Sequence, residues 1–403
     1  MKILVLNAGS SSHKAALFDL AQGSTPQWRS QLDWRDQAAT VELTAQTADG
    51  RHHQATLATQ SPLEGLRWLL DTLVESPVQV LIDLAEIQAV GHRVVHGGQH
   101  YQQSTVITPA VKAAIRELFA IAPAHNPANL EGIEAIETLL GAVPQVAVFD
   151  TAFHAHLPAA ARTYPGPYEW VAQGIQRYGF HGISHRYVAH RAAELMGQNL
   201  QDLRLITCHL GNGCSLAAVR GGVSVDTTMG FTPLDGLMMG SRSGSIDPGI
   251  VLHLLRHGQL TVAELDALLN QGSGLRGLSG VSNDLRQVLE AAQRQGDETA
   301  YRAQLAFDVF IHSLRRHLGA MLGSLGGLDA LVFTAGIGAN SVAVWQAACA
   351  HWDCLGLELD VAKLQRDSTD RDIAAAGSQV RVWVIHTQEE WAIAQDCYKL
   401  LAI

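Results

Sequence analysis

The sequence predicts an α/β protein of two lobes, and a repeated local pattern carries this prediction. Residues 2–6 (KILVL) form an apolar strand that leads into a loop of small residues from Asn7 to Ser12, and residues 14–20 return as a second strand. Residues 203–219 repeat the order of apolar strand, tight glycine loop (211–213) and returning strand. The repeat indicates a duplicated α/β architecture. A chain of 403 residues is also long enough for more than one domain, at roughly 150 residues each.

Composition excludes several classes of protein. Hydrophobic residues make up 47% and charged residues 16% of the chain, which suits a large core and argues against intrinsic disorder. The 38 acidic and 28 basic residues give a formal charge of −10, so the chain has no basic surplus for nucleic acid. No apolar run reaches the roughly 18 residues of a membrane-spanning helix.

The cysteines point to a reducing compartment. The chain has five of them, an odd number, and they are scattered without a C-x-x-C pair: Cys208, Cys214, Cys349, Cys354 and Cys397. This spacing argues against a structural zinc site and against a disulfide framework. A cytoplasmic location fits best.

Further elements of the first half follow from local patterns. The stretch up to about residue 60 shows alternation and predicts strands and loops. A helix is expected at 62–75, because Pro62 suits a first helical turn. The remaining predictions are a strand around 87–95 that leads into HRVVHGG, helices at 109–120 and 127–140, and the strand QVAVFD (145–150).

The second half continues with the same kinds of element. After the repeat, the sequence predicts helices near 247–257 and 298–323, the strand LDALVF (328–333), a glycine-rich loop TAGIGAN (334–340), the strand VRVWVI (380–385) and a helix from about 388 to 400. No low-complexity linker or run of charges separates these elements. Short hinges are therefore expected between the domains.

Glycine-rich loops after apolar strands suggest a phosphate-bearing ligand. In NAGSSSHK (7–14), serine hydroxyls and backbone N–H groups can form a concave nest for an anion, and Lys14 adds a positive charge. The segment does not match the G-x-x-x-x-G-K-[ST] pattern of a P-loop. HLGNG (209–213) and TAGIGAN (334–340) also follow strands, and ligands of open α/β sheets bind at strand ends. One such loop alone is usually a turn, whereas three together favour a nucleotide held between two lobes.

Two arginines have unusual surroundings. Arg93 in GHRVVHGG (91–98) and Arg242 in GLMMGSRSGSIDPG (236–249) are flanked by glycine or serine. The planar guanidinium matches the oxygens of a carboxylate or phosphate. A single arginine most often forms a surface salt bridge, but this local context favours ligand binding.

Other candidate residues have plausible structural explanations. Asp150 ends an apolar strand, a frequent position for a metal ligand or base but also for a helix N-cap. His181 follows an aromatic residue and precedes a glycine, in a chain with 19 histidines. Glu389 and Glu390 begin the last helix, where acidic residues interact favourably with the helix dipole.

Taken together, these segments resemble the acetate kinase family, which belongs to a superfamily with sugar kinases, actin and a class of chaperones. The resemblance covers essentially the whole chain in order: NAGSSSHK, GHRVVHGG, APAHNP (122–127), VFDTAFH (148–154), RYGFHGISH (177–185), HLGNG, GLMMGSRSG, SNDLR (282–286), TAGIGAN and TQEEW (387–391). Ten segments in register are far more specific than one glycine motif.

The resemblance implies a fold and a reaction. The fold would be the duplicated ribonuclease-H-like, actin-like ATPase fold, with an N-terminal lobe of residues 1–150, residues 386–403 packing back on it, and a C-terminal nucleotide-binding lobe of residues 151–385. The enzyme would be a homodimer that transfers the γ-phosphoryl group of ATP reversibly to acetate, giving acetyl phosphate and ADP. Mg²⁺ would be the metal, with Mn²⁺ as an alternative. Propionate is the close rival to acetate.

The resemblance also implies roles for individual residues. Asn7 and Glu389 match the metal site, Arg93 matches the clamp for the substrate carboxylate, and Val95, Ala124, Phe180 and Pro233 match the pocket for the acyl group. Asp150 matches the residue assigned as acid/base, and His181 and Arg242 match the residues that stabilise the transition state. The implied ATP contacts are Lys14, His209, Leu210, Gly211, Asn212, Gly213, Asp284, Leu285, Arg286, Gly336, Ile337, Gly338, Ala339 and Asn340.

These residue types suit the chemistry. Phosphoryl transfer needs alignment and neutralisation of negative charge more than covalent help. The acceptor is already ionised near neutral pH, since a carboxyl group has a pKa of about 4. We therefore expect Asp150 to position Arg242 or a metal-bound water and not to abstract a proton.

Some positions depart from the family pattern. His13 and Leu285 stand where leucine and phenylalanine are common, and Ala339 replaces a glutamate. Leu285 and Ala339 lie in nucleotide-contacting segments, which leaves the selectivity for the nucleotide base open. Ala124 replaces a leucine, which leaves the size of the acyl pocket open.

Two other functions would need a different set of residues. A non-catalytic nucleotide switch would need the nucleotide loops but not Arg93, Asp150, His181 and Arg242 together. A sugar kinase would need polyol-binding residues in place of an arginine clamp.

Overall fold

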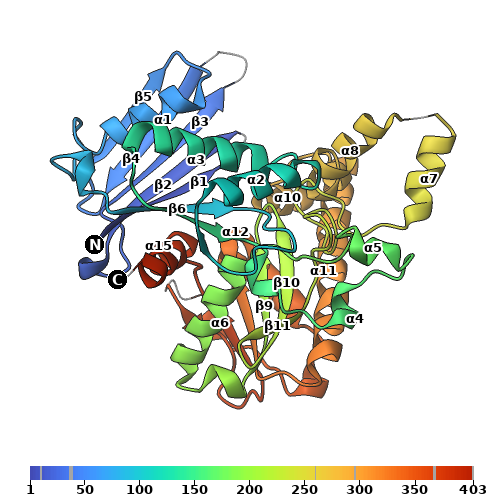
Figure 1. Cartoon of the computed structure of the whole chain (residues 1–403). Helices are drawn as coiled ribbons and strands as arrows, with labels where there is room; N and C mark the ends of the chain where they lie inside the picture. The colour runs from blue at the N-terminus through green and yellow to red at the C-terminus, as the bar shows by residue number, and fades with distance from the viewer. Residues whose placement is uncertain (10, 36–39, 259, 295, 366–368, 402–403) are drawn as a thin grey trace. The chain divides into compact units, whose positions relative to one another are not determined.

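The computed structural model describes the chain except for residues 10, 36–39, 259, 295, 366–368 and 402–403, so Ser10 of the first loop lies outside the described residues. The chain divides into two compact units (Figure 1). Unit 1 comprises residues 1–152 and 388–403, and unit 2 comprises residues 153–387. The chain therefore passes from one unit to the other twice, after Ala152 and after Thr387.

Unit 1 is built on a mixed sheet of eight strands in the order β5-β4-β3-β2-β1-β6-β8-β7. Strands β1, β6 and β8 are parallel, whereas β1 to β5 form antiparallel pairs. The strands are β1 (Lys2–Ala8), β2 (Ser12–Asp19), β3 (Trp28–Arg35), β4 (Thr40–Thr47), β5 (His52–Leu57), β6 (Ala89–Val94), β7 (Thr105–Val106) and β8 (Gln145–Phe149).

Helices cover both faces of this sheet, which explains why KILVL is apolar throughout. Leu4 and Leu6 point to the face that carries α1 (Pro62–Asp71) and α3 (Asn126–Leu140), while α2 (Pro109–Glu117) packs beside α3. The opposite face carries α15 (Glu389–Leu401) (Figure 1). The Trp391 ring of this helix lies 5.6 Å from that of Phe18.

The contact between α15 and β6 requires a glycine. A Cβ atom at Gly91 would lie 2.6 Å from Cys397 Sγ and 2.6 Å from a methyl carbon of Ile393. Such distances are shorter than any real Cβ contact, so only glycine allows the helix to approach this closely. The close approach places the first turn of α15 on the sheet face that includes Arg93.

Unit 2 contains a second mixed sheet, of six strands in the order β11-β10-β9-β12-β14-β13. Its strands are β9 (Arg204–Leu210), β10 (Cys214–Arg220), β11 (Val223–Thr227), β12 (Ala330–Thr334), β13 (Arg371–Asp372) and β14 (Arg381–Val384). The order β11-β10-β9-β12-β14 repeats β3-β2-β1-β6-β8, with the same parallel and antiparallel neighbours. The predicted duplicated ribonuclease-H-like fold is therefore confirmed.

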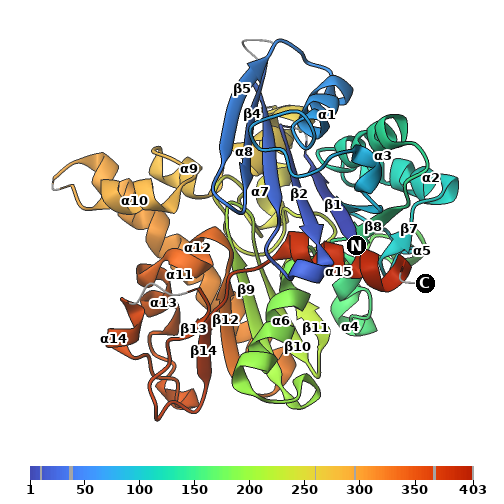
Figure 2. The ribbon, with the colours of Figure 1, turned by 90° about the vertical axis from the view of Figure 1, so that its left-hand side faces the viewer.

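Helices also cover both faces of the second sheet (Figures 1 and 2). Helix α6 (Gly182–Met196) packs Val188 and Ala192 against one face. Helix α11 (Glu298–Leu325) covers the other face, where it contacts β9, β10 and β11. The other helices of this unit are α4 (Ala159–Arg162), α5 (Glu169–Ala172), α7 (Pro248–Arg256), α8 (Val262–Gln271), α9 (Gly274–Ser279), α10 (Leu285–Ala292), α12 (Ala335–Asn340), α13 (Val342–Cys349) and α14 (Val361–Leu364). Short 3₁₀ turns occupy Leu20–Gln22, Leu84–Glu86, Leu118–Ala120, Ala152–His154, Leu200–Asp202 and Asp353–Leu355.

One local prediction was wrong. TAGIGAN was expected to be a loop, but residues 335–340 form helix α12, which begins directly after β12. The absence of a side chain at Gly338 allows this helix to lie close to the carbonyl of Cys208. The returning strand was expected from residue 14, and β2 begins two residues earlier, at Ser12, so that Lys14 lies within it.

The described helices include none long and apolar enough to cross a membrane.

Candidate active site

A row of polar side chains crosses three strands of unit 1. Asn7 on β1 is the register partner of Lys14 on β2, and Leu6 pairs with His92 on β6, so that Arg93 is the next residue beside Asn7. Neighbouring residues of paired strands point to the same face of a sheet. Lys14, Asn7 and Arg93 therefore share the face covered by α15, while Asp150 follows the end of β8 directly.

Arg93 is the centre of this row. Its Nη2 donates to Asp150 Oδ2 at 2.5 Å and its Nη1 donates to Asn7 Oδ1 at 3.4 Å. Its Nε lies 3.8 Å from a carboxylate oxygen of Glu389, the first residue of α15. The Asp150 side chain is fully buried and that of Arg93 is 19% exposed. Unit 1 thus brings the proposed carboxylate clamp, both proposed metal-site residues and the proposed acid/base together.

Two buried atoms of this cluster lack a hydrogen-bond partner among the described residues. They are Arg93 Nε and Asp150 Oδ1. A buried polar atom without a partner carries a cost of about 1–3 kcal/mol. A donor and an acceptor that both lack a partner in one cluster suit a ligand that supplies both an anionic oxygen and a cation.

Electrostatics tie the cluster together. Burial disfavours the charged form of Arg93, but the carboxylates of Asp150 and Glu389 outweigh it and raise the pKa of the guanidinium. Burial also raises the pKa of Glu389 to about 7, although the positive charges of Arg93 and Lys14 oppose the shift. Glu389 is therefore a carboxylate that a bound cation would stabilise in its charged form.

Two asparagines that the sequence analysis did not single out hold the loop after β6. Asn129 accepts a hydrogen bond from Val95 N at 3.0 Å and donates to Ala8 O at 2.6 Å, so it joins the ends of β6 and β1. Asn126 accepts from His96 N at 3.2 Å and donates to His96 O at 3.1 Å. Both lie in the first turns of α3, in or directly after the APAHNP segment, which is the signal that could have found them.

In unit 2, His181 occupies a strained backbone position. It stands immediately before α6 with φ 56° and ψ 26°, in the left-handed region that residues other than glycine rarely adopt. Its ring stacks on that of His209, with centroids 4.0 Å apart, and its Nδ1 lies 2.8 Å from Ser215 Oγ. Strain of this kind, at a cost of order 1–3 kcal/mol, gathers at functional sites.

The predicted nucleotide segments of unit 2 also lie together. Gly240 N donates to Asn212 O at 3.0 Å, and Asn283 Nδ2 donates to Asn212 Oδ1 at 3.1 Å. A Cβ atom at Gly240 would lie 2.2 Å from Asn212 Oδ1, so glycine is required there. The loop 209–213, the segment 282–286 and the loop that carries Arg242 thus meet at Asn212.

The third segment, helix α12, lies at the end of β9. A Cβ atom at Gly338 would be 3.3 Å from Cys208 O and 3.5 Å from Leu210 Cβ. Ala335 begins this helix with φ 66°, a second left-handed residue at a predicted site. Trp345 Nε1 donates to Gly338 O at 2.7 Å and holds the helix in place, and Ala339 is buried.

Asp284 and Arg286 form an exposed pair at the start of α10. Asp284 caps the helix by accepting from Arg286 N, and its carboxylate lies 2.6 Å from Arg286 Nη2. The hydrogen bond from Arg286 lowers the pKa of Asp284. The Arg286 side chain is 91% exposed, so it can turn to a ligand, whereas Leu285 between them is buried.

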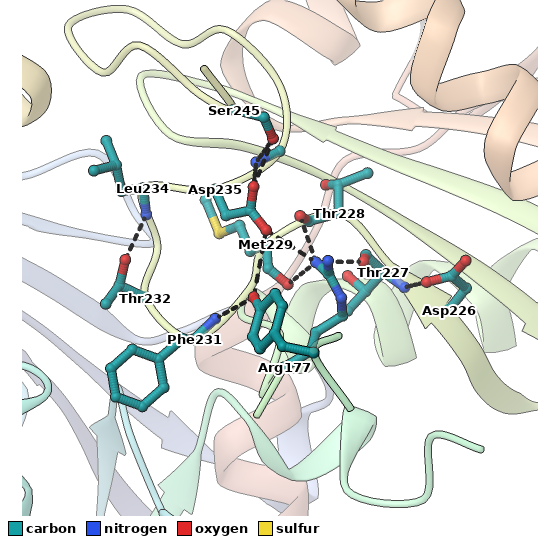
Figure 3. A network of polar contacts seen from close by, with 12 residues as sticks. Arg177, Asp226, Thr227, Thr228, Met229, Phe231, Thr232, Leu234, Asp235 and Ser245 are labelled. Carbon is teal, nitrogen blue, oxygen red and sulfur yellow. Dashed lines mark hydrogen bonds and ion pairs between the residues drawn. The ribbon is translucent and has the colours of Figure 1, made fainter. Parts of the chain in front are cut away.

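Arg242 lies on a loop that hydrogen bonds from a second arginine, Arg177, stabilise. Arg177 Nη1 donates to the carbonyl oxygens of Thr227, Thr228 and Met229 at 2.8–3.1 Å and lies 3.3 Å from Asp235 Oδ2 (Figure 3). Asp235 in turn accepts from Ser245 Oγ at 2.5 Å. The sequence analysis missed this network, although Arg177 begins the RYGFHGISH segment.

The loop presents Arg242 next to His181. Arg242 Nη1 donates to Pro233 O at 3.1 Å. A Cβ atom at Gly213 would be 3.4 Å from His181 Cε1 and 3.5 Å from Arg242 Nη1. Both side chains therefore adjoin the GNG loop, and His181 directly follows the buried Phe180.

The four residues implied for the acyl pocket divide between the units. Val95 is buried after β6 and Ala124 lies exposed in the turn before α3, both in unit 1. Phe180 and Pro233 belong to unit 2.

The donor atoms of unit 1 fit a hard cation. Among the described residues there is no group of three or more His, Cys, Asp or Glu side chains that could cage a metal. Mg²⁺ does not need such a cage, because it usually keeps several waters and is bound by one or two carboxylates together with phosphate oxygens. Asn7 Oδ1, the Glu389 carboxylate and the unpartnered Asp150 Oδ1 are oxygen ligands of this kind.

Comparisons with known proteins agree over the whole chain. The sequence model of the acetokinase family matches residues 2–395. A protein of Gloeobacter violaceus named acetate kinase is 59% identical, with all of both chains covered. The crystal structure of Porphyromonas gingivalis acetate kinase is similar with a TM-score of 0.92 and 37% identity, covering 99% of each chain. A propionate kinase from Francisella tularensis is similar with a TM-score of 0.89 and 38% identity, covering 98% of each chain.

Proposed function

The chain belongs to the acetokinase family, and we propose that it is an acetate kinase, which transfers the γ-phosphoryl group of ATP reversibly to acetate and forms acetyl phosphate and ADP. The observation that carries the proposal is the Arg93 cluster. A largely buried guanidinium is held by Asp150 and Asn7, while its Nε lies 3.8 Å from Glu389 and has no hydrogen-bond partner among the described residues. That is a binding position for a small carboxylate and not for a sugar hydroxyl.

On the acceptor side, Arg93 binds and orients the acid. Its guanidinium is kept charged by the two carboxylates beside it, so it can offer a charge-assisted hydrogen bond to the acid. Asp150 holds the guanidinium at one edge and leaves Nε for the ligand. A fixed donor of this kind lowers the entropy cost of aligning the nucleophilic oxygen.

On the side of the phosphoryl donor, unit 2 supplies the groups that stabilise negative charge on the transferred phosphoryl group. His181 and Arg242 adjoin the GNG loop, and that loop is joined through Asn212 to the segment that contains Asp284 and Arg286. We assign the nucleotide to this set. Hydrogen bonds from His181 and Arg242 that strengthen as negative charge spreads over the phosphoryl oxygens raise kcat more than they tighten binding.

Asp150 acts as a positioning group in this scheme. The acid is a carboxylate and needs no base to become a nucleophile. Asp150 already accepts a short hydrogen bond from Arg93, and its other oxygen is open to a cation or water.

Asn7, Glu389 and Asp150 would hold Mg²⁺, or Mn²⁺ in its place. When bound, the ion neutralises phosphate charge and orients the phosphates for in-line transfer.

The test is an assay for acyl phosphate, trapped as the hydroxamate, with ATP-Mg and acetate, propionate or butyrate. An acetate kinase forms acetyl hydroxamate at the highest kcat/KM. Formation of propionyl hydroxamate at a higher kcat/KM would favour the propionate kinase function, which the likeness to the Francisella protein keeps as the second candidate. No acyl phosphate from any acid would leave only the non-catalytic nucleotide switch.

We propose in addition that the chain forms a homodimer through helix α7. None of the residues of this helix is buried, although its sequence PGIVLHLLR is mostly apolar, and Ile250 and Leu252 are 48% and 49% exposed. Apolar helix faces of this kind are commonly covered by a second copy. Light scattering of the wild type and of Leu252→Glu tests this, and a dimer unaffected by the charge would place the interface elsewhere.

We also propose a cytoplasmic location. The five cysteines are free thiols, four of them buried, and a reducing compartment keeps thiols in this state.

A further inference from the structure

A chain of buried hydrogen bonds runs from His181 into the interior of unit 2. His181 Nδ1 lies 2.8 Å from Ser215 Oγ, and Ser215 Oγ lies 2.7 Å from His185 Nε2. His185 Nδ1 lies 2.7 Å from Thr207 Oγ1. Ser215, His185 and Thr207 are all fully buried. The proposed function uses only the first residue of this chain.

The fold explains how the chain forms. His181 and His185 are four residues apart at the start of α6, so their rings lie on the same side of the helix. That helix packs on β9, and Ser215 on β10 is the register partner of His209 on β9. Ser215 therefore lies beneath both rings and contacts each of them.

Proton counting gives the chain a direction. A hydroxyl has one hydrogen, so Ser215 can donate to only one of its two histidine neighbours and must accept from the other. If the Thr207 hydroxyl gives its hydrogen to Ala217 O, which lies 3.5 Å away, Thr207 Oγ1 accepts from His185 Nδ1 at 2.7 Å. His185 then carries its hydrogen on Nδ1, its Nε2 accepts from Ser215, and Ser215 accepts from His181 Nδ1.

The surroundings keep His185 neutral, as this direction requires. Burial lowers the pKa of His185 well below its ordinary value, and the nearby rings of His154 and His209 add to the effect. A neutral His185 with its hydrogen on Nδ1 is a pure acceptor at Nε2.

We propose that Ser215 and His185 are positioning residues that fix the tautomer of His181, with the hydrogen on Nδ1 and the lone pair on Nε2. The inference rests on the proposed function, because it concerns the same phosphoryl transfer. It means that neutral His181 cannot donate from Nε2. The ring must take up a proton at Nε2 to donate to a phosphoryl oxygen, so the imidazolium is the active form.

The groups that face His181 give Ser215 a second effect. The ring stacks on His209, and Arg242 lies on the other side of the GNG loop residue Gly213, while His185 and His154 stand behind Ser215. Of these groups, Arg242 carries a positive charge and opposes a second positive charge on His181. The Ser215 hydroxyl stabilises that charge by accepting from Nδ1.

The first test reads the tautomer directly and needs no substrate. Nuclear magnetic resonance of ¹⁵N-histidine-labelled protein, with His181→Gln to assign the signal, distinguishes a protonated from an unprotonated ring nitrogen. We expect neutral wild-type His181 to carry its hydrogen on Nδ1 and Ser215→Ala to give a mixture. A wild-type ring with its hydrogen on Nε2 would overturn the proposal. Because this measurement is independent of activity, its failure is distinct from failure of the proposed function.

The second test is kinetic, and the chain offers a matched control. Ser224 is buried and its Oγ lies 2.8 Å from His154 Nδ1, so Ser224→Ala removes the same type of contact from a histidine that has no hydrogen bond to Ser215. Ser215→Ala should lower kcat by about tenfold to hundredfold, the worth of one hydrogen bond to a charged group, with little change in KM. The alkaline limb of its kcat–pH profile should move to lower pH. Ser224→Ala should change neither kcat nor the pH profile. Equal kcat values and equal pH profiles for the two serine variants would refute the proposal.

Two variants of His185 distinguish the effect of its hydrogen bond to Ser215 from the effect of its packing. His185→Gln keeps an acceptor that can face Ser215, whereas His185→Leu keeps only volume. Rescue by glutamine but not by leucine, at equal melting temperature, is the expected result. Equal kcat and equal pH profiles for the two variants would show that His185 acts through packing alone.

Discussion

Arg93 and Asp150 form a short link between β6 and the residue that follows β8, with Nη2 of the guanidinium 2.5 Å from Oδ2 of the carboxylate. The pair leaves Arg93 Nε and Asp150 Oδ1 as buried atoms without a hydrogen-bond partner among the described residues. The bond that holds the pair therefore uses neither of these two atoms.

Replacing Arg93 with alanine should weaken binding of the acid. A hydrogen bond to a charged group contributes about 1.5–3 kcal/mol, so kcat/KM for acetate should fall by about one to two orders of magnitude, mostly through KM. Steady-state kinetics with varied acetate measures this. The control is Arg29→Ala, which removes an exposed arginine that pairs with Glu390 at 3.1 Å on the same sheet. An unchanged KM for acetate in Arg93→Ala would remove Arg93 from the substrate site.

Replacing Arg242 with alanine should act on kcat. Its proposed contact strengthens only as charge develops in the transition state, and arginines in this role contribute about 10³-fold or more. Turnover at saturating ATP and acetate measures the effect. Arg220→Ala is the matched control, because Arg220 donates to the carbonyls of Ser324 and Leu325 in the same unit. Near-normal turnover of Arg242→Ala would contradict the assignment.

Replacing Asp150 with asparagine should leave measurable activity and a pH profile of unchanged shape. The amide oxygen can still accept from Arg93, and the acceptor carboxylate needs no base. The measurement is kcat/KM for acetate across the pH range. A limb attributable to one base in the wild type that disappears in Asp150→Asn would identify Asp150 as a proton acceptor.

Ala124 should influence the choice of acid. It lies exposed in the turn before α3, so a leucine can be placed there without a clash in the core. Discrimination over one methylene is worth only about 1–3 kcal/mol, so we expect propionate within about tenfold of acetate in kcat/KM. Ala124→Leu should shift the ratio toward acetate. Strong acetate preference in the wild type that Ala124→Leu does not alter would exclude this position from the pocket.

Unit 1 should lose stability as the pH falls below neutral, and His13 should contribute. Burial lowers its pKa from 6.5 to about 4, so the unfolded chain binds a proton between these values while the native chain does not. This stability is present above pH 6.5 and is lost as the pH falls toward 4, by about 1.4 kcal/mol per pH unit.

His13→Leu tests this, because it removes the titrating ring from a fully buried site beside Trp34. Urea unfolding of both proteins at several pH values gives the difference in free energy of unfolding. The difference should grow in favour of the leucine variant as the pH falls. A difference that does not change with pH would mean that His13 has the same pKa in the native and unfolded chains.

Sequence alone could predict the duplication, because both strand–loop–strand units are apolar runs interrupted by glycine. It could also nominate Arg93, Asp150 and Arg242, whose surroundings or strand-end positions are unusual for a charged residue. Their grouping followed from the parallel order of β1, β6 and β8, which no local pattern specifies.

The supporting residues could not be predicted in the same way. Asn129 and Arg177 donate to backbone carbonyls distant in sequence. Every residue has a backbone carbonyl, so the sequence does not show which carbonyls they bind. Helix α12 was missed because its glycines usually break helices in water, whereas here they allow contact with β9.

The placement of α15 has a consequence for synthesis of the protein. Residues 153–387 leave the ribosome after most of unit 1 and before the helix that covers one face of its sheet. Throughout that interval the apolar side chains of Val5 and Phe18 on this face lack their covering helix, and Glu389 is absent from the Arg93 cluster. The nascent chain therefore exposes this apolar strand surface for the time needed to translate the whole of unit 2, and the Arg93 cluster is complete only after α15 has been synthesised.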